Sequence, residues 1–175
     1  MATSNFATRQ YAFEAFVESC GAILFDLEQD KNKVCLIHHI AKNERMLAKG
    51  RQNCGESRQE AALRETREET AYQCQTHPVT MSMRAPPKIK IGDDIPDEAR
   101  EFLDLTEPFM LTIRETHIKL IWWYIAVLDK EAPVVMPAGE ADSEAGFFSM
   151  DEAVQKPSFQ NDRDVLERAI SLVGK

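Results

Sequence analysis

Three glutamates, Glu65, Glu68 and Glu69, are spaced so that a helix would gather their carboxylates in one sector about 100° wide. Like charges at this spacing repel one another, so we expect a positive charge beside them. Carboxylate clusters suit magnesium or manganese, which also bind phosphate oxygens and lower the pKa of a bound water. The pattern indicates metal-dependent chemistry on a phosphate, although a solvated helix face is the ordinary role of a charge run.

A capping box marks the start of the helix that would carry these glutamates. The Ser57 oxygen can accept from a free amide of the first turn, while Glu60 reaches back to the backbone. We therefore predict a helix from near Arg58 to about Thr70. A neighbouring sector of this helix can pack against a sheet, and it consists of Ala62, Leu63, Thr66 and Thr70.

The matching positions extend beyond the helix, over Gly50 to Tyr72. This segment resembles the Nudix box, whose pattern is Gly, five residues, Glu, seven residues, Arg-Glu, a nonpolar residue, one residue, Glu-Glu, one residue, Gly and a nonpolar residue. The positions in register are Gly50, Glu56, Arg64, Glu65, Glu68 and Glu69. By this resemblance the chain is identified as a member of the Nudix hydrolase family, which cleaves phosphoanhydride bonds with magnesium or manganese.

Two positions depart from the box. Thr66 stands where a nonpolar residue is usual, and its methyl group can still pack. Ala71 replaces the final glycine, which we expect to be a left-handed cap at the end of the helix. Alanine in that conformation costs on the order of 1 kcal/mol, or the helix ends in another way.

The resemblance implies roles for individual residues. Glu65, Glu68 and Glu69 match the family's metal-binding and water-activating glutamates, and we assign Glu68 as the base and the other two as principal ligands. The carbonyl of Lys49 matches a frequent backbone ligand. Arg64 is expected to orient carboxylates by ion pairing with Glu56 or Glu68.

Basic residues surround the start of the box. Either they form a solvated loop or they are a basic rim for an anionic polyphosphate, and they comprise Lys42, Arg45, Lys49 and Arg51, with Arg84, Lys88 and Lys90 as further members. Lys49-Gly50-Arg51 resembles the Lys-Gly-Gly or Lys-Gly-His start of the box in Nudix enzymes that act on dinucleoside and diphosphoinositol polyphosphates. We therefore count Gly50 with the substrate-binding residues. Glu140, Asp142 and Glu144 lie where many family members place a further acid.

Strand and helix patterns alternate around the box, which predicts a layered α/β fold. We expect strands at 17–27, 33–40, 72–83, 108–116 and 119–128, with a hairpin at 115–117 and a long irregular connection at 85–97. A second capping box at Ser149 and Glu152, and a cap at Asn161, predict two further helices. The resemblance covers Phe16 to Val173 and implies an α/β/α sandwich around a mixed sheet.

The composition bounds the remaining possibilities. A chain of 175 residues suits a single domain at 16–175 behind an N-terminal extension at 1–15, and its net charge of -8 argues against general nucleic-acid binding. Its sequence pattern predicts neither a membrane span nor a signal sequence, and its four cysteines are too sparse for a disulfide scaffold. We expect a cytoplasmic or also nuclear protein, monomeric or homodimeric, although secretion of a longer precursor stays open.

The substrate is expected to be a small phosphorylated molecule, either a diphosphoinositol polyphosphate or a dinucleoside polyphosphate. Two alternatives remain. One is a non-catalytic module that binds a nucleotide or a protein, and the other is an enzyme that removes damaged nucleoside triphosphates and releases pyrophosphate. Trp122 and Trp123 point to opposite sides of their strand, and core packing is the favoured role over stacking on a base.

Overall fold

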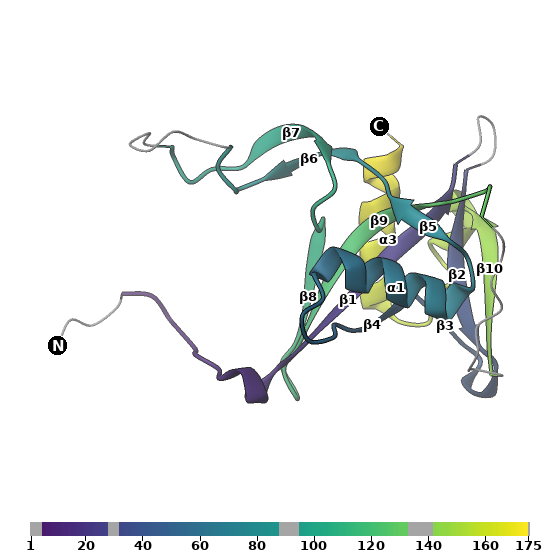
Figure 1. Ribbon diagram of the computed structural model, residues 1–175, viewed down its shortest axis with the longest axis horizontal. Helices are drawn as coiled ribbons and strands as arrows, with labels where there is room; N and C mark the ends of the chain where they lie inside the picture. The colour runs from purple at the N-terminus through teal and green to yellow at the C-terminus, as the bar shows by residue number, and fades with distance from the viewer. Residues whose placement is uncertain (1–4, 28–31, 88–94, 133–141, 175) are drawn as a thin grey trace.

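The computed structural model describes residues 5–27, 32–87, 95–132 and 142–174 (Figure 1). Within these residues, eight strands form one sheet and two more form a separate ribbon. The sheet contains β1 (Val17–Asp26), β2 (Lys33–His39), β3 (Glu44–Met46), β4 (Lys49–Arg51), β5 (Cys74–Thr76), β8 (Met110–Arg114), β9 (Lys119–Leu128) and β10 (Ser143–Ser149), and the ribbon contains β6 (Val79–Met83) and β7 (Arg100–Leu105). The helices are α1 (Arg58–Thr70), α2 (Met150–Ala153) and α3 (Gln160–Val173), with 3₁₀ turns η1 (Phe13–Ala15) and η2 (Ile40–Lys42).

The main sheet is mixed, and its strand order is β10-β2-β1-β9-β5. The long central strands β1 and β9 run parallel, from Val17 opposite Lys119 to Phe25 opposite Val127. The other pairings are antiparallel: β4 lies beside the start of β1, β3 beside the end of β2, and β8 beside the start of β9. The predicted mixed sheet is confirmed.

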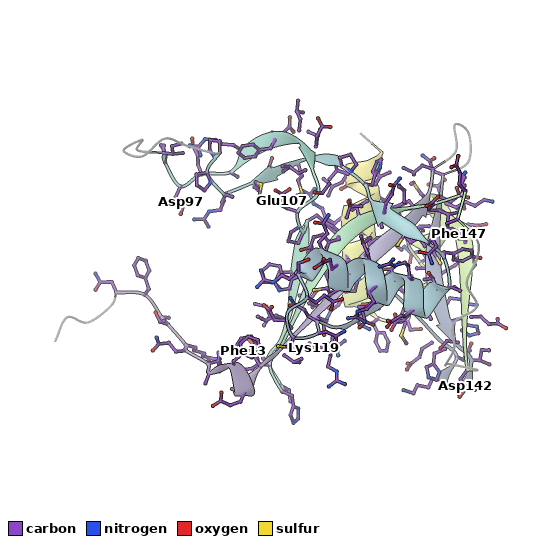
Figure 2. All side chains as sticks on the ribbon, viewed as in Figure 1. Phe13, Asp97, Glu107, Lys119, Asp142 and Phe147 are labelled. Atoms are coloured by element: carbon purple, nitrogen blue, oxygen red, sulfur yellow. The ribbon has the colours of Figure 1, made fainter. Side chains whose placement is uncertain are left out.

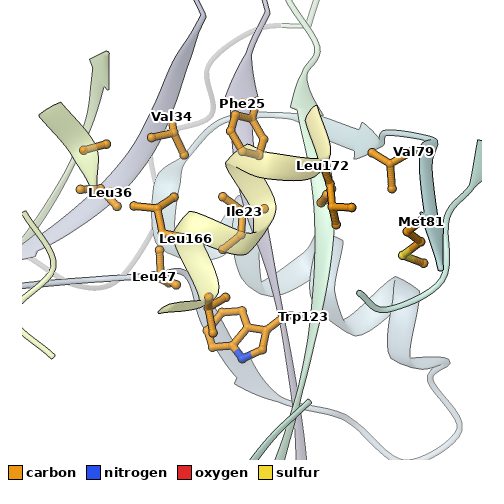
Figure 3. Packing of buried hydrophobic residues seen from close by; sticks show 14 of the residues in the cluster. Ile23, Phe25, Val34, Leu36, Leu47, Val79, Met81, Trp123, Leu166 and Leu172 are labelled. Carbon is orange, nitrogen blue, oxygen red and sulfur yellow. The ribbon is translucent and has the colours of Figure 1, made fainter. Parts of the chain in front are cut away.

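Helices α1 and α3 cover opposite faces of this sheet, which makes the α/β/α sandwich (Figure 1). Alternate residues of β1 serve the two faces: Ile23 and Phe25 pack in the cluster under α3, whereas Ala22 and Leu24 pack under α1. Figure 3 shows the larger, α3-side cluster, to which α3 contributes Leu166 and Leu172.

The two tryptophans occupy opposite faces, as expected. Trp123 is buried in the α3-side core, where its Nε1 donates to Thr112 Oγ1 at 2.9 Å. Trp122 packs on the α1 side, and the Arg58 guanidinium lies 4.1 Å from its ring centroid. Trp123 is therefore a core residue. Trp122 packs on the α1 side and also makes a cation–π contact with Arg58.

Several local predictions were wrong. The strand expected at 72–83 is two strands, because Pro78 cannot continue the ladder and β6 leaves the main sheet to pair with β7. The β7 strand itself was not predicted, nor were β3 and β4. Ser149 makes no side-chain cap, since it is still paired with Lys33 in the sheet. Asn161 lies inside α3, whose N-cap is Phe159.

The chain before β1 leads away from the sandwich (Figure 1), and Phe6 and Phe13 are exposed along it. The division into an extension at 1–15 and a domain at 16–175 stays a prediction. In the part of the chain that the structure describes, no helix is long and apolar enough to cross a membrane. All four cysteines are free.

Candidate active site

Helix α1 begins with the capping box expected from the sequence. The Glu60 amide donates to Ser57 Oγ at 3.2 Å, and the Ser57 amide donates to Glu60 Oε2 at 2.9 Å. Thr66 is fully buried, and its hydroxyl donates to the Ala62 carbonyl at 2.8 Å. A threonine therefore fits the nonpolar position of the box, because its polar atom is satisfied within the helix.

Strand β4 brings Gly50 directly against Glu65. A Cβ atom on Gly50 would collide with the carboxylate of Glu65, so only glycine permits this approach. The next residue back also holds a glutamate, since the Lys49 amide donates to Glu69 Oε2 at 2.8 Å. The backbone of β4 thus positions two of the three carboxylates of α1.

Arg64 holds the remaining acids in place. Its Nε and Nη2 form a two-pronged ion pair with Glu56 at 2.7 and 2.9 Å, which also lowers the pKa of Glu56. Its Nη1 donates to Glu65 at 2.7 Å and to Glu68 at 3.1 Å, and Nη2 donates to the Arg51 carbonyl at 3.0 Å. The expected ion pairs of Arg64 are present, and they extend to a third carboxylate.

The three glutamates differ in exposure. The Glu65 side chain is 14% exposed and the Glu68 side chain 59%. In the described residues, no three acidic, histidine or cysteine side chains converge on a point that could hold a cation. The carboxylates accept hydrogen bonds from the charged Arg64 guanidinium and from the neutral Lys49 amide.

The donor set nevertheless fits a divalent cation. Carboxylates and a backbone carbonyl are the ligands that magnesium and manganese prefer. The space that Gly50 leaves beside the Glu65 carboxylate is a second point of fit, because a side chain there would push that ligand away. Glu65, Glu68, Glu69 and the Lys49 carbonyl are the groups that would hold the ion.

Helix α1 ends at Ala71 in the left-handed conformation, with φ 67° and ψ 0°. Its amide donates to the Arg67 carbonyl at 2.9 Å. The alanine therefore adopts the backbone geometry expected of the missing glycine, and the helix retains its usual exit at some cost in strain.

A cluster of cations lies on the other face of β4. The side chains of Lys49 and Arg51 point away from Gly50, because neighbours on a strand alternate. A Cβ on Gly21 would lie 2.8 Å from Lys49 Cβ and 2.8 Å from the Trp123 ring, which places Lys49 on the α3 side. The hairpin of β8 and β9 adds Arg114 and Lys119, which are paired in register.

We call Lys49, Arg51, Arg114 and Lys119 the cation cluster. None of the four forms a salt bridge with another described residue. Burial, and then repulsion from its three cationic neighbours, lower the pKa of Lys119, against a smaller opposing effect of Glu65. Four cations gathered without a salt bridge, in a chain of net charge -8, are a feature that suits binding of an anion.

The other basic and acidic residues singled out from the sequence lie in several different parts of the structure. Lys42 lies in η2 and Arg45 in β3, where the Arg45 amide donates to Ser158 Oγ at 2.9 Å. Arg84 pairs with Asp97 at the projecting ribbon. Asp142 lies at the β10 edge, away from Lys119 (Figure 2), and Glu144 pairs with His38 in the sheet. Lys88, Lys90 and Glu140 lie outside the described residues.

Sequence reasoning missed Arg114 and Lys119. The predicted hairpin at 115–117 was a usable signal, since it makes these two residues neighbours. Their approach to Lys49 and Arg51 depends on β9 running beside β1, which nothing in the local sequence indicates.

A pocket of about 450 Å³ opens beside the cation cluster. Lys49 and Arg114 belong to both. The rest of its lining includes Glu44 from β3 and Phe159, Asn161 and Asp162 from the start of α3. We call this cavity the α3 pocket.

Comparison with known proteins agrees with the box. The NUDIX domain family matches residues 18–169. No curated protein matches the chain. Among solved structures, the C. elegans Ap4A hydrolase is 14% identical with a TM-score of 0.56, covering 89% of this chain and 97% of its own. At this identity the likeness shows the fold alone.

Two further structures show the same fold. A NUDIX hydrolase from Nitrosomonas europaea is 17% identical over 89% of this chain and 88% of that chain, with a TM-score of 0.55. The NUDIX domain of Shewanella oneidensis NrtR, complexed with ADP ribose, is 16% identical over 92% of each chain, with a TM-score of 0.56.

Proposed function

The chain belongs to the Nudix family of pyrophosphohydrolases, and from that premise we propose that it cleaves a phosphoanhydride bond in a dinucleoside or diphosphoinositol polyphosphate, with magnesium as cofactor. One observation carries the proposal. Strand β4 presents Gly50 to the carboxylates of α1 on one face and contributes Lys49 and Arg51 to a cation cluster without salt bridges on the other. Carboxylates for a metal thus lie beside cations for phosphates.

Each carboxylate of α1 has a distinct task in this proposal. Glu65, against Gly50, and Glu69, against the Lys49 amide, are oriented by backbone groups, as metal ligands need to be. Glu68, whose side chain is 59% exposed against 14% for Glu65, accepts the proton of the attacking water. When bound, magnesium or manganese supplies a water of lowered pKa and positive charge against the phosphates.

Arg64 is a positioning residue here, because its donors are all directed at protein oxygens.

The cation cluster holds phosphate groups that do not react. Charge-assisted contacts to phosphate are among the stronger hydrogen bonds, so the cluster favours a substrate with several phosphates over a monophosphate ester. The Lys-Gly start of the box supports the same substrate classes.

The test is a screen of phosphoanhydride substrates with magnesium and with manganese, reading the released products. Diadenosine polyphosphates or diphosphoinositol polyphosphates should be hydrolysed, and Glu68→Gln and Glu69→Gln should each abolish turnover in a folded protein. Glu167→Gln, at an exposed position of α3, is the matched control. Retained turnover in both variants would contradict the roles assigned to Glu68 and Glu69.

A second candidate, a non-catalytic binding module, is favoured by one observation: the NrtR domain of similar fold is complexed with ADP ribose. Binding of such ligands without turnover of any substrate in the screen would favour it. Release of pyrophosphate from nucleoside triphosphates would instead indicate removal of damaged nucleotides.

We also propose a cytoplasmic location for this enzyme. The four free cysteines, of which Cys54 is exposed, suit a reducing compartment. Imaging of the tagged chain tests this location.

Size-exclusion chromatography with light scattering decides between a monomer and a homodimer.

A further inference from the structure

The α3 pocket differs in chemistry from the cation cluster that adjoins it. Two of its lining residues, Lys49 and Arg114, are cations, but Glu44 and Asp162 bring two carboxylates into the same cavity. Carboxylates repel phosphate groups, so this pocket is poorly suited to a further phosphate of an inositol ring. The same carboxylates accept hydrogen bonds from N–H donors.

Asp162 is the most informative residue of the pocket, because it is only 9% exposed. Burial raises its pKa, while Lys49, a backbone hydrogen bond from Leu47 and Arg114 act in the opposite direction. Neither cation forms a salt bridge with Asp162 among the described residues. A buried carboxylate with capacity to accept further hydrogen bonds suits a ligand that donates them.

Phe159 supplies an apolar surface at the mouth of the same pocket. It is 48% exposed, and it precedes the polar pair Asn161 and Asp162 by one turn or less. An exposed ring next to an amide and a carboxylate can stack on a flat heterocycle while its edge is read by hydrogen bonds. A volume of about 450 Å³ accommodates such a group.

The shared residues connect the two regions. Lys49 and Arg114 lie at the border, so a ligand whose phosphates contact the cation cluster can extend into the α3 pocket. We propose that the α3 pocket binds a nucleobase carrying an amino group, with Phe159 as the stacking residue and Asp162 as an acceptor, which makes a dinucleoside polyphosphate the preferred substrate. This inference rests on the proposed function for its reacting bond, but its binding test does not require turnover.

The binding experiment is calorimetric titration of the intact protein without metal. The probes are adenosine 5′-monophosphate, inosine 5′-monophosphate, which lacks the amino group, ribose 5-phosphate and inositol hexakisphosphate. Adenosine monophosphate should bind at least about tenfold more tightly than ribose 5-phosphate, because stacking and base hydrogen bonds add to the phosphate contact. Equal affinity for these two probes overturns the proposal.

Two variants assign the residues. Phe159→Ala should weaken the binding of adenosine monophosphate about fivefold or more and leave the affinity for ribose 5-phosphate unchanged. Asp162→Asn should remove most of the preference for adenosine over inosine monophosphate. Phe6→Ala, at another exposed phenylalanine, in the N-terminal segment, is the control and should change nothing. Equal losses for all probes would mean a structural role and overturn the assignment, and thermal unfolding identifies a misfolded variant.

Should Asp162→Asn fail to fold, Phe159→Ala still decides, since its ring is half exposed. Turnover separates the two proposals. Hydrolysis of a diadenosine polyphosphate with kinetics that Phe159→Ala does not affect would leave the proposed function standing and overturn the pocket. A base preference in binding, with no hydrolysis of any phosphoanhydride, would support the pocket and contradict the proposed function.

Discussion

The two faces of β4 carry opposite charges that are balanced in different ways. On the α1 face, Arg64 is paired with three carboxylates, and the Lys49 amide donates to Glu69. On the α3 face, the cation cluster has no salt bridge to a described residue. The first face is therefore organised before any ligand arrives, whereas the second carries a repulsion that an anion relieves.

The largest effect is expected from Gly50→Ala. The added Cβ collides with the Glu65 carboxylate and displaces it from β4, and a misplacement of about 1 Å can lower turnover about 100-fold. Steady-state kinetics should show this loss mainly in kcat. Gly146→Ala is the matched control, because its Cβ would meet only Phe148 at an ordinary 3.6 Å. Equal activity of the two variants would contradict the role given to Gly50.

Removing a cation from the cluster should change KM rather than kcat. Arg114→Met and Lys119→Met are each expected to raise KM about tenfold, by loss of one charge-assisted contact, with little change in kcat. The wild-type KM should rise with ionic strength more steeply than that of either variant. Arg84→Met, which alters a cation at the ribbon, should match the wild type in both respects.

Alkaline pH should act on the two faces with opposite signs. Burial raises the pKa of Cys20 and Cys35, on the α1 side, to about 12. The unfolded chain loses these protons first, so their stabilisation is complete below pH 9.0 and declines toward about pH 12. The pKa of Lys119 is lowered, so its contribution to stability rises with pH instead.

Denaturant unfolding across this range measures the difference. Stability should fall with rising pH, Cys35→Ala should flatten the fall, and Lys119→Met should steepen it. A shallower profile for Lys119→Met would show that the cation cluster does not repel as inferred.

The smallest effect is expected at Ala71. Glycine adopts φ 67° without the Cβ penalty, so Ala71→Gly should stabilise the fold by about 0.5–1 kcal/mol and leave turnover unchanged. Ala62→Gly, in the right-handed interior of the same helix, should destabilise by about 1 kcal/mol or more. Chemical denaturation compares the two, and the same sign for both would mean that the cap is unstrained.

Some parts of the fold and of the site could be predicted from the sequence, and others could not. The helix of the box, its capping residues and the pairing of Arg64 followed from spacing, since all of these contacts lie within about two turns of one helix or its preceding loop. The strands β1, β2 and β9 were readable because buried strands are long apolar runs. The β6–β7 ribbon was not, since its strands pair across a segment that looked irregular.

Local spacing in the sequence by itself determined the family, the capped helix and the residues that point to metal-dependent hydrolysis, because helix geometry converts spacing directly into proximity. Only the tertiary structure decided that Gly50 touches Glu65, that Lys49 meets Arg114 at a pocket, and that Asn161 lines this pocket rather than capping a helix. These contacts depend on which strands become neighbours and in which register, and that is settled by packing across the whole domain.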